Sequence, residues 1–280
     1  MTVIAAKSAG ASRAAGRLAE HKETSSEVAG IAISSPGKLF YPEARLSKLD
    51  LARYYAAVGA RMLPHLRDRP LSLLRCPDGR GKECFFQKHA QPAVHRAVAR
   101  IEAPEMRGAA TYLSANSVGA IVALLLWGVI ELHPWGARKH ALHCPDRLIL
   151  DFDPGPEVPW HDLVSLVRSC RELLEHHDLT GFLKTTGGKG LHVVVPIRPT
   201  LDWSAARAFT KPIAETLARA APDRIVTSAA SKSTRMGKIF IDYLRARTLQ
   251  LQPRSSGKSL RATCASITSI SRTSGLASRA

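Results

Sequence analysis

Residues 147–153 read Arg-Leu-Ile-Leu-Asp-Phe-Asp, and they decide how the rest of the chain is interpreted. The apolar run predicts a strand, and side chains on a strand alternate between its two faces. Asp151 and Asp153 therefore share one face, whereas Phe152 turns the other way into the core. Two carboxylates held together repel one another unless a cation lies between them, and carboxylate oxygens suit Mg²⁺ or Mn²⁺. The alternative is a strand end with two solvated acids, which the pair taken alone favours.

The composition indicates a folded chain with an anionic partner. The 280 residues are 45% hydrophobic and carry a formal net charge of +17. That apolar content predicts a globular core, and the charge favours nucleic acid, ahead of an anionic membrane, as the partner. The longest apolar run, residues 118–130, is too short to span a bilayer. Five scattered cysteines without a secretory segment predict reduced intracellular thiols.

A third aspartate lies on a later predicted strand, residues 238–244, which reads Lys-Ile-Phe-Ile-Asp-Tyr-Leu. If this strand neighbours the first one, Asp242 joins Asp151 and Asp153. Three carboxylates can hold divalent metal over a triphosphate, which is the two-metal arrangement of nucleotidyl transfer. The sequence alone therefore predicts a metal site.

A glycine-rich turn, Thr186-Gly187-Gly188-Lys189-Gly190, lies between the aspartate strands and joins predicted strands 181–185 and 191–195. It is no P-loop, because that motif needs a different spacing and a following helix. Its backbone N–H groups, lysine and hydroxyl can still form a phosphate nest. A glycine-rich hairpin with no ligand is the alternative.

The first predicted helix begins at Ser47, a favourable N-cap, and places Lys48 in its first turn. A lysine there opposes the helix dipole, whereas an anion at the same end is favoured. Lys48 and Lys38 are therefore candidates for an anion site, with a solvated surface lysine as the alternative.

The other predicted elements are a strand at 28–33, a hairpin of strands 71–74 and 84–87, a helix at 118–129 capped by Ser114 or Asn116, and helices at 160–176 and 203–220, the last capped by Asp202.

Aromatic residues suggest further contacts with a ligand. Phe85 and Phe86 are adjacent on a strand, so one can join the core while the other is exposed among basic residues for base stacking. The alternative is that the second ring meets another layer of the protein. His133 lies in a Glu-Leu-His-Pro-Trp-Gly-Ala-Arg segment that can contact a ligand or pack structurally. Cys76, Cys84 and His89 lack the close spacing of a zinc site.

These residues together resemble a known family, the polymerase domain of bacterial ATP-dependent DNA ligase D, in the archaeo-eukaryotic primase superfamily. The resemblance runs from about Val28 to Arg245. It rests on the blocks SPGKLFYPEARLSKLDLARYY, RPLSLLRCPDGRGKECFFQKH, ELHPWGAR, PDRLILDFDPGP, KTTGGKGLHVVVP and IFIDYLR, which occur in the family's order.

The resemblance implies a role for each candidate residue. Asp151, Asp153 and Asp242 would be the catalytic metal ligands. The nucleotide would be bound by Thr186, Gly187, Lys189, His192 and His133. Lys38 and Lys48 would recognise a 5′-phosphate at a DNA break, and Phe85 and Phe86 would meet the template strand.

The resemblance also implies the fold, the reaction and the partners. The fold is α/β (α+β), with mixed sheets, helices packed on them and a catalytic core related to the RNA-recognition fold. The reaction is transfer of ribo- or deoxyribonucleotides to DNA ends and gaps, using two Mn²⁺ or Mg²⁺ ions, in non-homologous end joining. The partners are DNA with 5′-phosphorylated ends or gaps, a Ku-type end-binding protein and a DNA ligase. The location is the bacterial cytoplasm, at the nucleoid, with no membrane.

The ends of the chain depart from this pattern. Residues 1–28 are expected to be a disordered tail or linker, residues 29–245 the polymerase domain, and residues 246–280 a divergent, disordered tail. Because the departure after Arg245 is abrupt, we hypothesise a shift of reading frame there. The alternative function is then a catalytically impaired domain that only binds 5′-phosphorylated ends; a primase is a third possibility.

Overall fold

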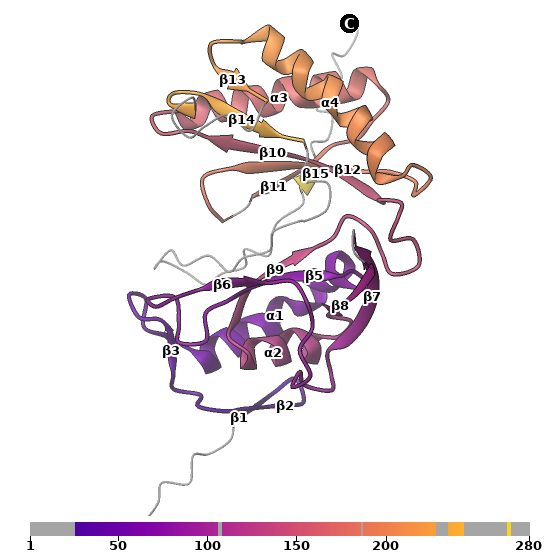
Figure 1. Ribbon diagram of the computed structural model, residues 1–280. Coiled ribbons are helices and arrows are strands. Elements are labelled where there is room, and N and C mark those ends of the chain that lie inside the picture. The colour runs from indigo at the N-terminus through magenta and orange to yellow at the C-terminus, as the bar shows by residue number, and fades with distance from the viewer. Residues whose placement is uncertain (1–25, 106–107, 186, 228–234, 244–267, 270–280) are drawn as a thin grey trace, which may run out of the picture.

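The computed structural model describes residues 26–105, 108–185, 187–227, 235–243 and 268–269. They form two lobes, and each lobe turns a β-sheet toward the other lobe and carries a pair of helices on its outer side (Figure 1). The mixed α/β fold class predicted from the sequence is confirmed. Among the described residues, no helix is long and apolar enough to cross a membrane.

The N-terminal lobe packs two helices against a five-stranded sheet. The helices are α1 (Lys48–Leu66) and α2 (Val118–Leu126). The sheet contains β5 (Leu71–Arg75), β6 (Phe85–Gln87), β7 (Ala99–Glu105), β8 (Gly108–Ser114) and β9 (Val129–Pro134). Its strand order is β6-β5-β8-β7, with β9 also paired to β5. Two small hairpins complete the lobe: β1 (Ser26–Val28) with β2 (Ile31–Ile33), and β3 (Leu39–Tyr41) with β4 (Leu46–Ser47).

The start of α1 follows its sequence signals. The Ser47 hydroxyl accepts a hydrogen bond from the Asp50 backbone N–H at 3.2 Å, and the Asp50 carboxylate accepts one from the Ser47 N–H at 2.9 Å. This reciprocal capping box fixes the first turn. The predicted N-cap is therefore confirmed, and Lys48 is the first helical residue.

The predicted cap of α2 is wrong. Ser117 caps this helix, accepting from the Ala120 backbone N–H at 3.0 Å. Ser114 ends β8 instead, and the Asn116 side chain bonds to Asp68. Pairing of Ser114 with Ala99 of β7, and the bond of Asn116 to Asp68, leave the next polar residue to begin the helix.

The N-terminal boundary also differs from its prediction. Residues 28–33 were expected to form one strand after a tail ending at 28, but a turn at Ala29-Gly30, with φ of 52° and 76°, splits them into the β1–β2 hairpin. A glycine in the left-handed region is typical of such a turn. The described fold therefore begins at Ser26.

The C-terminal lobe has the chain order β-α-β-β-α-β-β, which is that of the RNA-recognition fold with one two-residue strand added after the second helix. Its elements are β10 (Arg147–Pro154), α3 (Trp160–His176), β11 (Phe182–Thr185), β12 (Leu191–Pro196), α4 (Trp203–Ala220), β13 (Ile225–Val226) and β14 (Ile239–Asp242). The sheet order is β13-β14-β10-β12-β11-β15, where β15 is Thr268–Ser269. Both predicted helices are confirmed. Apart from β15, the predicted tail at 246–280 lies outside the described residues.

The two faces of this sheet differ in chemistry. Leu148, Leu150 and Phe152 of β10 are buried in one apolar cluster with residues of α3 and α4. The alternate residues of β10, among them Asp151 and Asp153, therefore project from the opposite, inward face, toward the N-terminal lobe (Figure 1). In RNA-recognition domains the face not covered by helices is the one that binds nucleic acid.

The β5–β6 hairpin is confirmed, but the expectation that one phenylalanine joins the core is wrong. Phe85 and Phe86 are 44% and 62% exposed. The reason is that β6 is an edge strand of its sheet, with a neighbouring strand on one side only. The Arg75 guanidinium lies 5.3 Å from the Phe85 ring centroid and holds that ring against the surface.

The same hairpin overturns the expectation of reduced thiols for two cysteines. Cys76 and Cys84 form a disulfide, with their Cα atoms 4.4 Å apart. Arg75 and Phe85 are paired across the two strands, which places the next residue on each side face to face. The spacing of eight residues around a predicted hairpin was a signal for this pairing.

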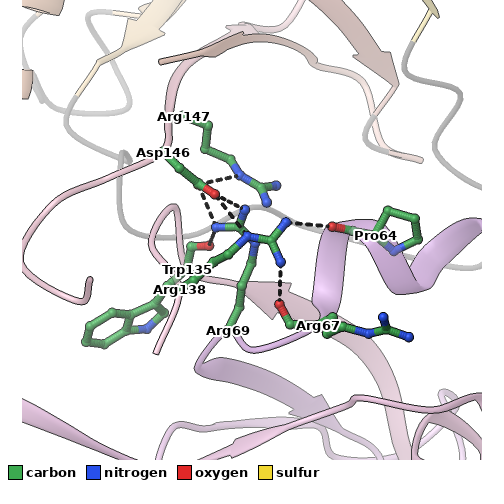
Figure 2. Close-up of polar contacts among 7 residues, drawn as sticks. All are labelled: Pro64, Arg67, Arg69, Trp135, Arg138, Asp146 and Arg147. Carbon is green, nitrogen blue, oxygen red and sulfur yellow. Dashed lines mark hydrogen bonds and ion pairs between the residues drawn. The ribbon is translucent and has the colours of Figure 1, made fainter. Parts of the chain in front are cut away.

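A polar network joins the two lobes (Figure 2). Asp146, just before β10, accepts bidentate hydrogen bonds from the Arg69 guanidinium at 2.7 and 2.5 Å. Arg138 Nε bonds to the same carboxylate at 3.2 Å, and Arg147 Nε lies 3.5 Å from it. Burial alone would raise the Asp146 pKa, but the Arg69 guanidinium brings it below its usual range. The carboxylate is therefore ionised and shared by three cations.

Arg138 and Asp146 tie this network to both lobes. Arg138 donates to the Pro64 carbonyl at the end of α1 at 3.2 Å and to the Arg67 carbonyl at 3.0 Å. The Asp146 carbonyl accepts from the Ile197 N–H, just after β12, at 3.0 Å. These bonds connect the end of α1 to the central strands of the second sheet.

The buried side chain of His65 should make the stability of the protein sensitive to acid. Burial and the positive charges of Arg147 and Arg69 lower the His65 pKa from 6.5 to about 4. The unfolded chain therefore binds a proton that the folded chain does not between these values, so stability present above pH 6.5 is lost as the pH falls toward 4. Between pH 6.5 and 4, the free energy of unfolding of His65→Gln should fall by on the order of 2 kcal/mol less than that of the parent. Urea denaturation at several pH values measures the difference. His177→Gln, an exposed change after α3, should keep the parent's acid sensitivity; an identical loss in both variants would contradict the assignment.

Candidate active site

A row of polar side chains crosses the inward face of the second sheet. Lys184 of β11 is paired with His192 of β12, His192 with Asp151 of β10, and Asp151 with Asp242 of β14. Residues directly opposite one another on antiparallel strands project to the same face. The strands that carry Asp151 and Asp242 are therefore neighbours, as the prediction of a three-aspartate site required.

The inner part of this row is buried. Lys184, His192 and Asp151 are all at most 1% exposed, and His192 Nε2 lies 3.2 Å from an Asp151 carboxylate oxygen. Burial lowers the Lys184 pKa to about 7, although the Asp151 carboxylate opposes the shift. Asp151 is thus held in place by a histidine and lies in the field of a lysine.

Asp153 is the next residue of β10 on the same face, and it lies against the glycine-rich turn. A Cβ built on Gly190 would be 2.8 Å from an Asp153 carboxylate oxygen and 2.8 Å from the Phe152 carbonyl oxygen. Only glycine allows this approach. The turn and the aspartate strand are therefore fitted to one another at atomic contact.

The aspartates suit a hard divalent cation by their chemistry. Asp153 and Asp242 are half-buried, and oxygen ligands on one face are what Mg²⁺ and Mn²⁺ take. Within the part of the chain that the structure describes, no group of three or more acidic, histidine or cysteine side chains forms a ready-made metal site. Mg²⁺ keeps several waters and commonly uses one or two carboxylates together with substrate phosphates. The donor set therefore fits an ion whose coordination shell is completed by substrate phosphates and water.

Gly190 provides a direct test of this fit. Gly190→Ala would force a methyl group into the Asp153 carboxylate, so we expect it to reduce stability by about 1–3 kcal/mol. It should also weaken Mn²⁺ binding, measured by titration calorimetry, by about tenfold, since moving one ligand removes roughly 1.4 kcal/mol. Gly37→Ala is the matched control, because nothing lies within 4 Å of its Cβ position. Equal effects of both substitutions would contradict the contact.

The glycine-rich turn lies beside a cavity of about 320 Å³. Gly188 and Lys189 line one side, and the loop after β10 with Trp160 lines the other. Gly187 has a φ of 83°, which favours glycine, and Lys189 is exposed. Thr186, the predicted hydroxyl contact, lies outside the described residues. The turn therefore offers a lysine and backbone groups next to Asp153.

His133 is on β9, in the sheet of the other lobe. Its Nε2 lies 3.0 Å from an oxygen of buried Glu131, and the Phe86 ring meets the imidazole edge-on with 5.2 Å between centroids. Ser72 of β5 is paired with His133 and Leu74 with Glu131, so these side chains share a face. The predicted pocket residue His133 and the predicted template residue Phe86 are thus in contact.

Lys38 and Lys48 meet at the start of α1. The Lys48 N–H donates to the Lys38 carbonyl at 2.7 Å, and Lys48 Nζ donates to the Ser34 hydroxyl at 3.2 Å. Lys48 is only 5% exposed, so the alternative of a solvated surface lysine is wrong. Burial lowers the Lys48 pKa, and the Lys38 charge lowers it further. Lys38 Nζ donates to the exposed Asp78 carboxylate at 3.0 Å, whereas the partner of Lys48 Nζ is a neutral hydroxyl. An anion near this helix N-terminus would therefore compensate the charge of Lys48.

Two residues of these sites were missed by sequence reasoning. Lys184 precedes the glycine-rich turn, and counting across that five-residue turn would have paired it with His192. Glu131 lies two residues before His133 on a predicted strand, and that spacing predicts a pair on one face. In both positions the alternation of strand side chains was the available signal.

Comparisons with known proteins identify the family of the chain. Residues 47–252 match the family described as LigD, primase-polymerase domain. The Pseudomonas aeruginosa multifunctional non-homologous end joining protein LigD is 39% identical over 238 residues, which are 85% of this chain and 27% of that protein. The Mycobacterium tuberculosis LigD (H37Rv) is 30% identical over 221 residues, 76% of this chain and 29% of that protein. The chain thus spans less than a third of the length of these relatives.

A solved structure shows the same fold. The polymerase domain from Mycobacterium tuberculosis ligase D, in complex with DNA, superposes with a TM-score of 0.74 at 28% identity, covering 81% of this chain and 83% of that one. The family match, the relative at 39% identity and the shared fold together show that the chain belongs to the LigD primase-polymerase domain family.

Proposed function

We propose that this chain is a nucleotidyltransferase that adds ribo- or deoxyribonucleotides at DNA ends and gaps during non-homologous end joining. The observation that carries the proposal is the position of Asp151, Asp153 and Asp242. They project from the inward face of an RNA-recognition-type sheet, beside a glycine-rich turn. Carboxylates next to a phosphate nest are what nucleotidyl transfer requires.

The three aspartates would hold two Mn²⁺ or Mg²⁺ ions. When bound, such ions neutralise charge on the attacking and leaving oxygens of an in-line displacement. His192 orients the Asp151 carboxylate through its 3.2 Å contact. Lys189 and the N–H groups of the turn would bind and orient the triphosphate, with Thr186 and Gly187 as further contacts. His133, steadied by Glu131, would contact the nucleotide from the opposite lobe.

The DNA end would be held by the N-terminal lobe. Lys38 and Lys48 would bind the 5′-phosphate at the start of α1. Phe85 and Phe86 are exposed aromatic rings beside Arg75 and can stack on template bases. The solved structure of a related domain with DNA supports a DNA partner for this chain.

Primer extension tests the proposal. The chain should extend the 3′-end of a gapped duplex with a 5′-phosphorylated downstream strand when Mn²⁺ or Mg²⁺ and nucleoside triphosphates are present, and a chelator should stop it. Tight, salt-sensitive binding without extension would overturn the catalytic proposal and favour the end-binding module.

The family context extends the proposal to partners. The relatives are named as multifunctional end-joining proteins. We therefore propose cooperation with a Ku-type end-binding protein and a DNA ligase, at the nucleoid in the bacterial cytoplasm.

A further inference from the structure

Arg147 is a buried cation at the junction of the lobes to which the mechanism above gives no role. It is the first residue of β10, four residues before Asp151 and on the same inward face. Its side chain is 7% exposed. A charge with so little contact with water needs a compensating partner.

The protein supplies only a weak partner for this guanidinium. Arg147 Nε lies 3.5 Å from Asp146, which is too long for a good hydrogen bond. The Asp146 oxygens already accept two bonds from Arg69 and one from Arg138. In Figure 2 no interaction reaches the two terminal nitrogens of Arg147, and among the described residues no other acceptor is recorded for them.

The surroundings of Arg147 are positive. Burial, and then the charge of Arg69, lower the Arg147 pKa to about 9, so the group remains charged at neutral pH. The same cations act on two neighbours: Arg147 contributes to the lowered pKa of His65 and to that of Lys184. One shared carboxylate, Asp146, faces three guanidiniums. The excess positive charge around Arg147 would therefore attract an anion.

We propose that Arg147 binds a backbone phosphate of nucleic acid lying along the inward face of the second sheet. The planar fork of arginine matches a phosphate bidentately, and its terminal nitrogens are the donors left for that contact. Four residues of strand separate it from Asp151, about 13 Å. The phosphate is thus an internal one, several nucleotide steps from the aspartates, and separate from the 5′-phosphate at Lys38 and Lys48. The choice of nucleic acid as ligand rests on the proposed function.

The salt dependence of DNA binding tests this inference. Each phosphate contact contributes about 0.9 to the slope of log affinity against log salt concentration on duplex DNA. Arg147→Gln should lower the magnitude of that slope by about 0.9, the contribution of one phosphate contact. Fluorescence anisotropy with gapped duplexes measures the slope, and the decrease should be the same with or without a 5′-phosphate. Arg171→Gln, which removes a surface charge on α3, is the control and should leave the slope unchanged. An unchanged slope in folded Arg147→Gln overturns the inference.

Thermal unfolding separates binding from structure. If Arg147 serves a ligand, the free Arg147→Gln protein should be as stable as the parent, because an ill-paired charge has been removed. A lower melting temperature with an unchanged slope would make Arg147 a purely structural residue and overturn the inference. If the glutamine variant does not fold, Arg147→Lys decides: a retained slope with weaker binding supports the inference, and binding equal to the parent overturns it. Primer extension by the parent is scored independently, so failure of the proposed function is distinguishable from failure of this site.

Discussion

Asp151→Ala should abolish primer extension, lowering its rate by at least about a thousandfold, or roughly 4 kcal/mol of transition-state stabilisation. Asp151 lies at the centre of the polar row, with His192 on one side and Asp242 on the other. Its loss would remove a proposed metal ligand and the carboxylate that opposes the lowered pKa of Lys184. Single-turnover extension of a gapped, 5′-phosphorylated duplex with Mn²⁺ is the measurement.

Binding to the same duplex separates chemistry from folding. Asp151→Ala should bind the DNA end within about twofold of the parent, because Lys38 and Lys48 lie in the other lobe. Asp151→Asn is the matched variant, since it keeps the shape of the side chain and removes only its charge. If extension survives in the asparagine variant, the carboxylate is not a metal ligand and the assignment of the site fails.

Lys48→Ala should have the opposite effect, removing the preference for a 5′-phosphate while the aspartate site remains intact. A charge-assisted hydrogen bond to a phosphate contributes about 1.5–3 kcal/mol, so affinity for the phosphorylated end should fall by about ten- to a hundredfold. Affinity for the same duplex with a 5′-hydroxyl should change little. Paired binding titrations with the two duplexes measure the difference directly.

Two further variants control for the burial of Lys48. Lys48→Met keeps the packed aliphatic stem and should lose the phosphate preference as fully as the alanine variant. Lys211→Met, on the outer helix α4, removes a charge of the same kind far from α1 and should retain the preference. Equal loss for phosphorylated and unphosphorylated ends would show that folding of the α1 start, not phosphate recognition, had been damaged.

Much of the C-terminal lobe could be predicted from local patterns. The alternation of Leu150, Asp151, Phe152 and Asp153 predicts which side chains face the core, and the structure buries Phe152 as expected. Helices α3 and α4 follow their apolar periodicity from end to end. These elements are predictable because each is decided by residues within a few positions of one another.

The unpredicted features depend on how distant elements meet. Whether Phe85 reaches the core depends on β6 being an edge strand, which no local pattern reveals. The choice of Ser117 as the cap of α2 depends on where β8 stops pairing. The network around Asp146 joins residues 69 and 146, so its three guanidiniums come together only through the packing of two lobes. Tertiary contact, and not propensity, decided each of them.

The order of the strands determines when the three proposed metal ligands can come together during translation. Asp151 and Asp242 lie side by side on β10 and β14, although 242 − 151 = 91 residues separate them. On a ribosome, Asp151 and Asp153 are synthesised long before β14 emerges. A domain synthesised only as far as α4 therefore has its glycine-rich turn but lacks the third aspartate. Under the proposed function, nucleotide addition therefore requires that synthesis has passed Asp242, so the order of the strands delays the activity until most of the fold has been made.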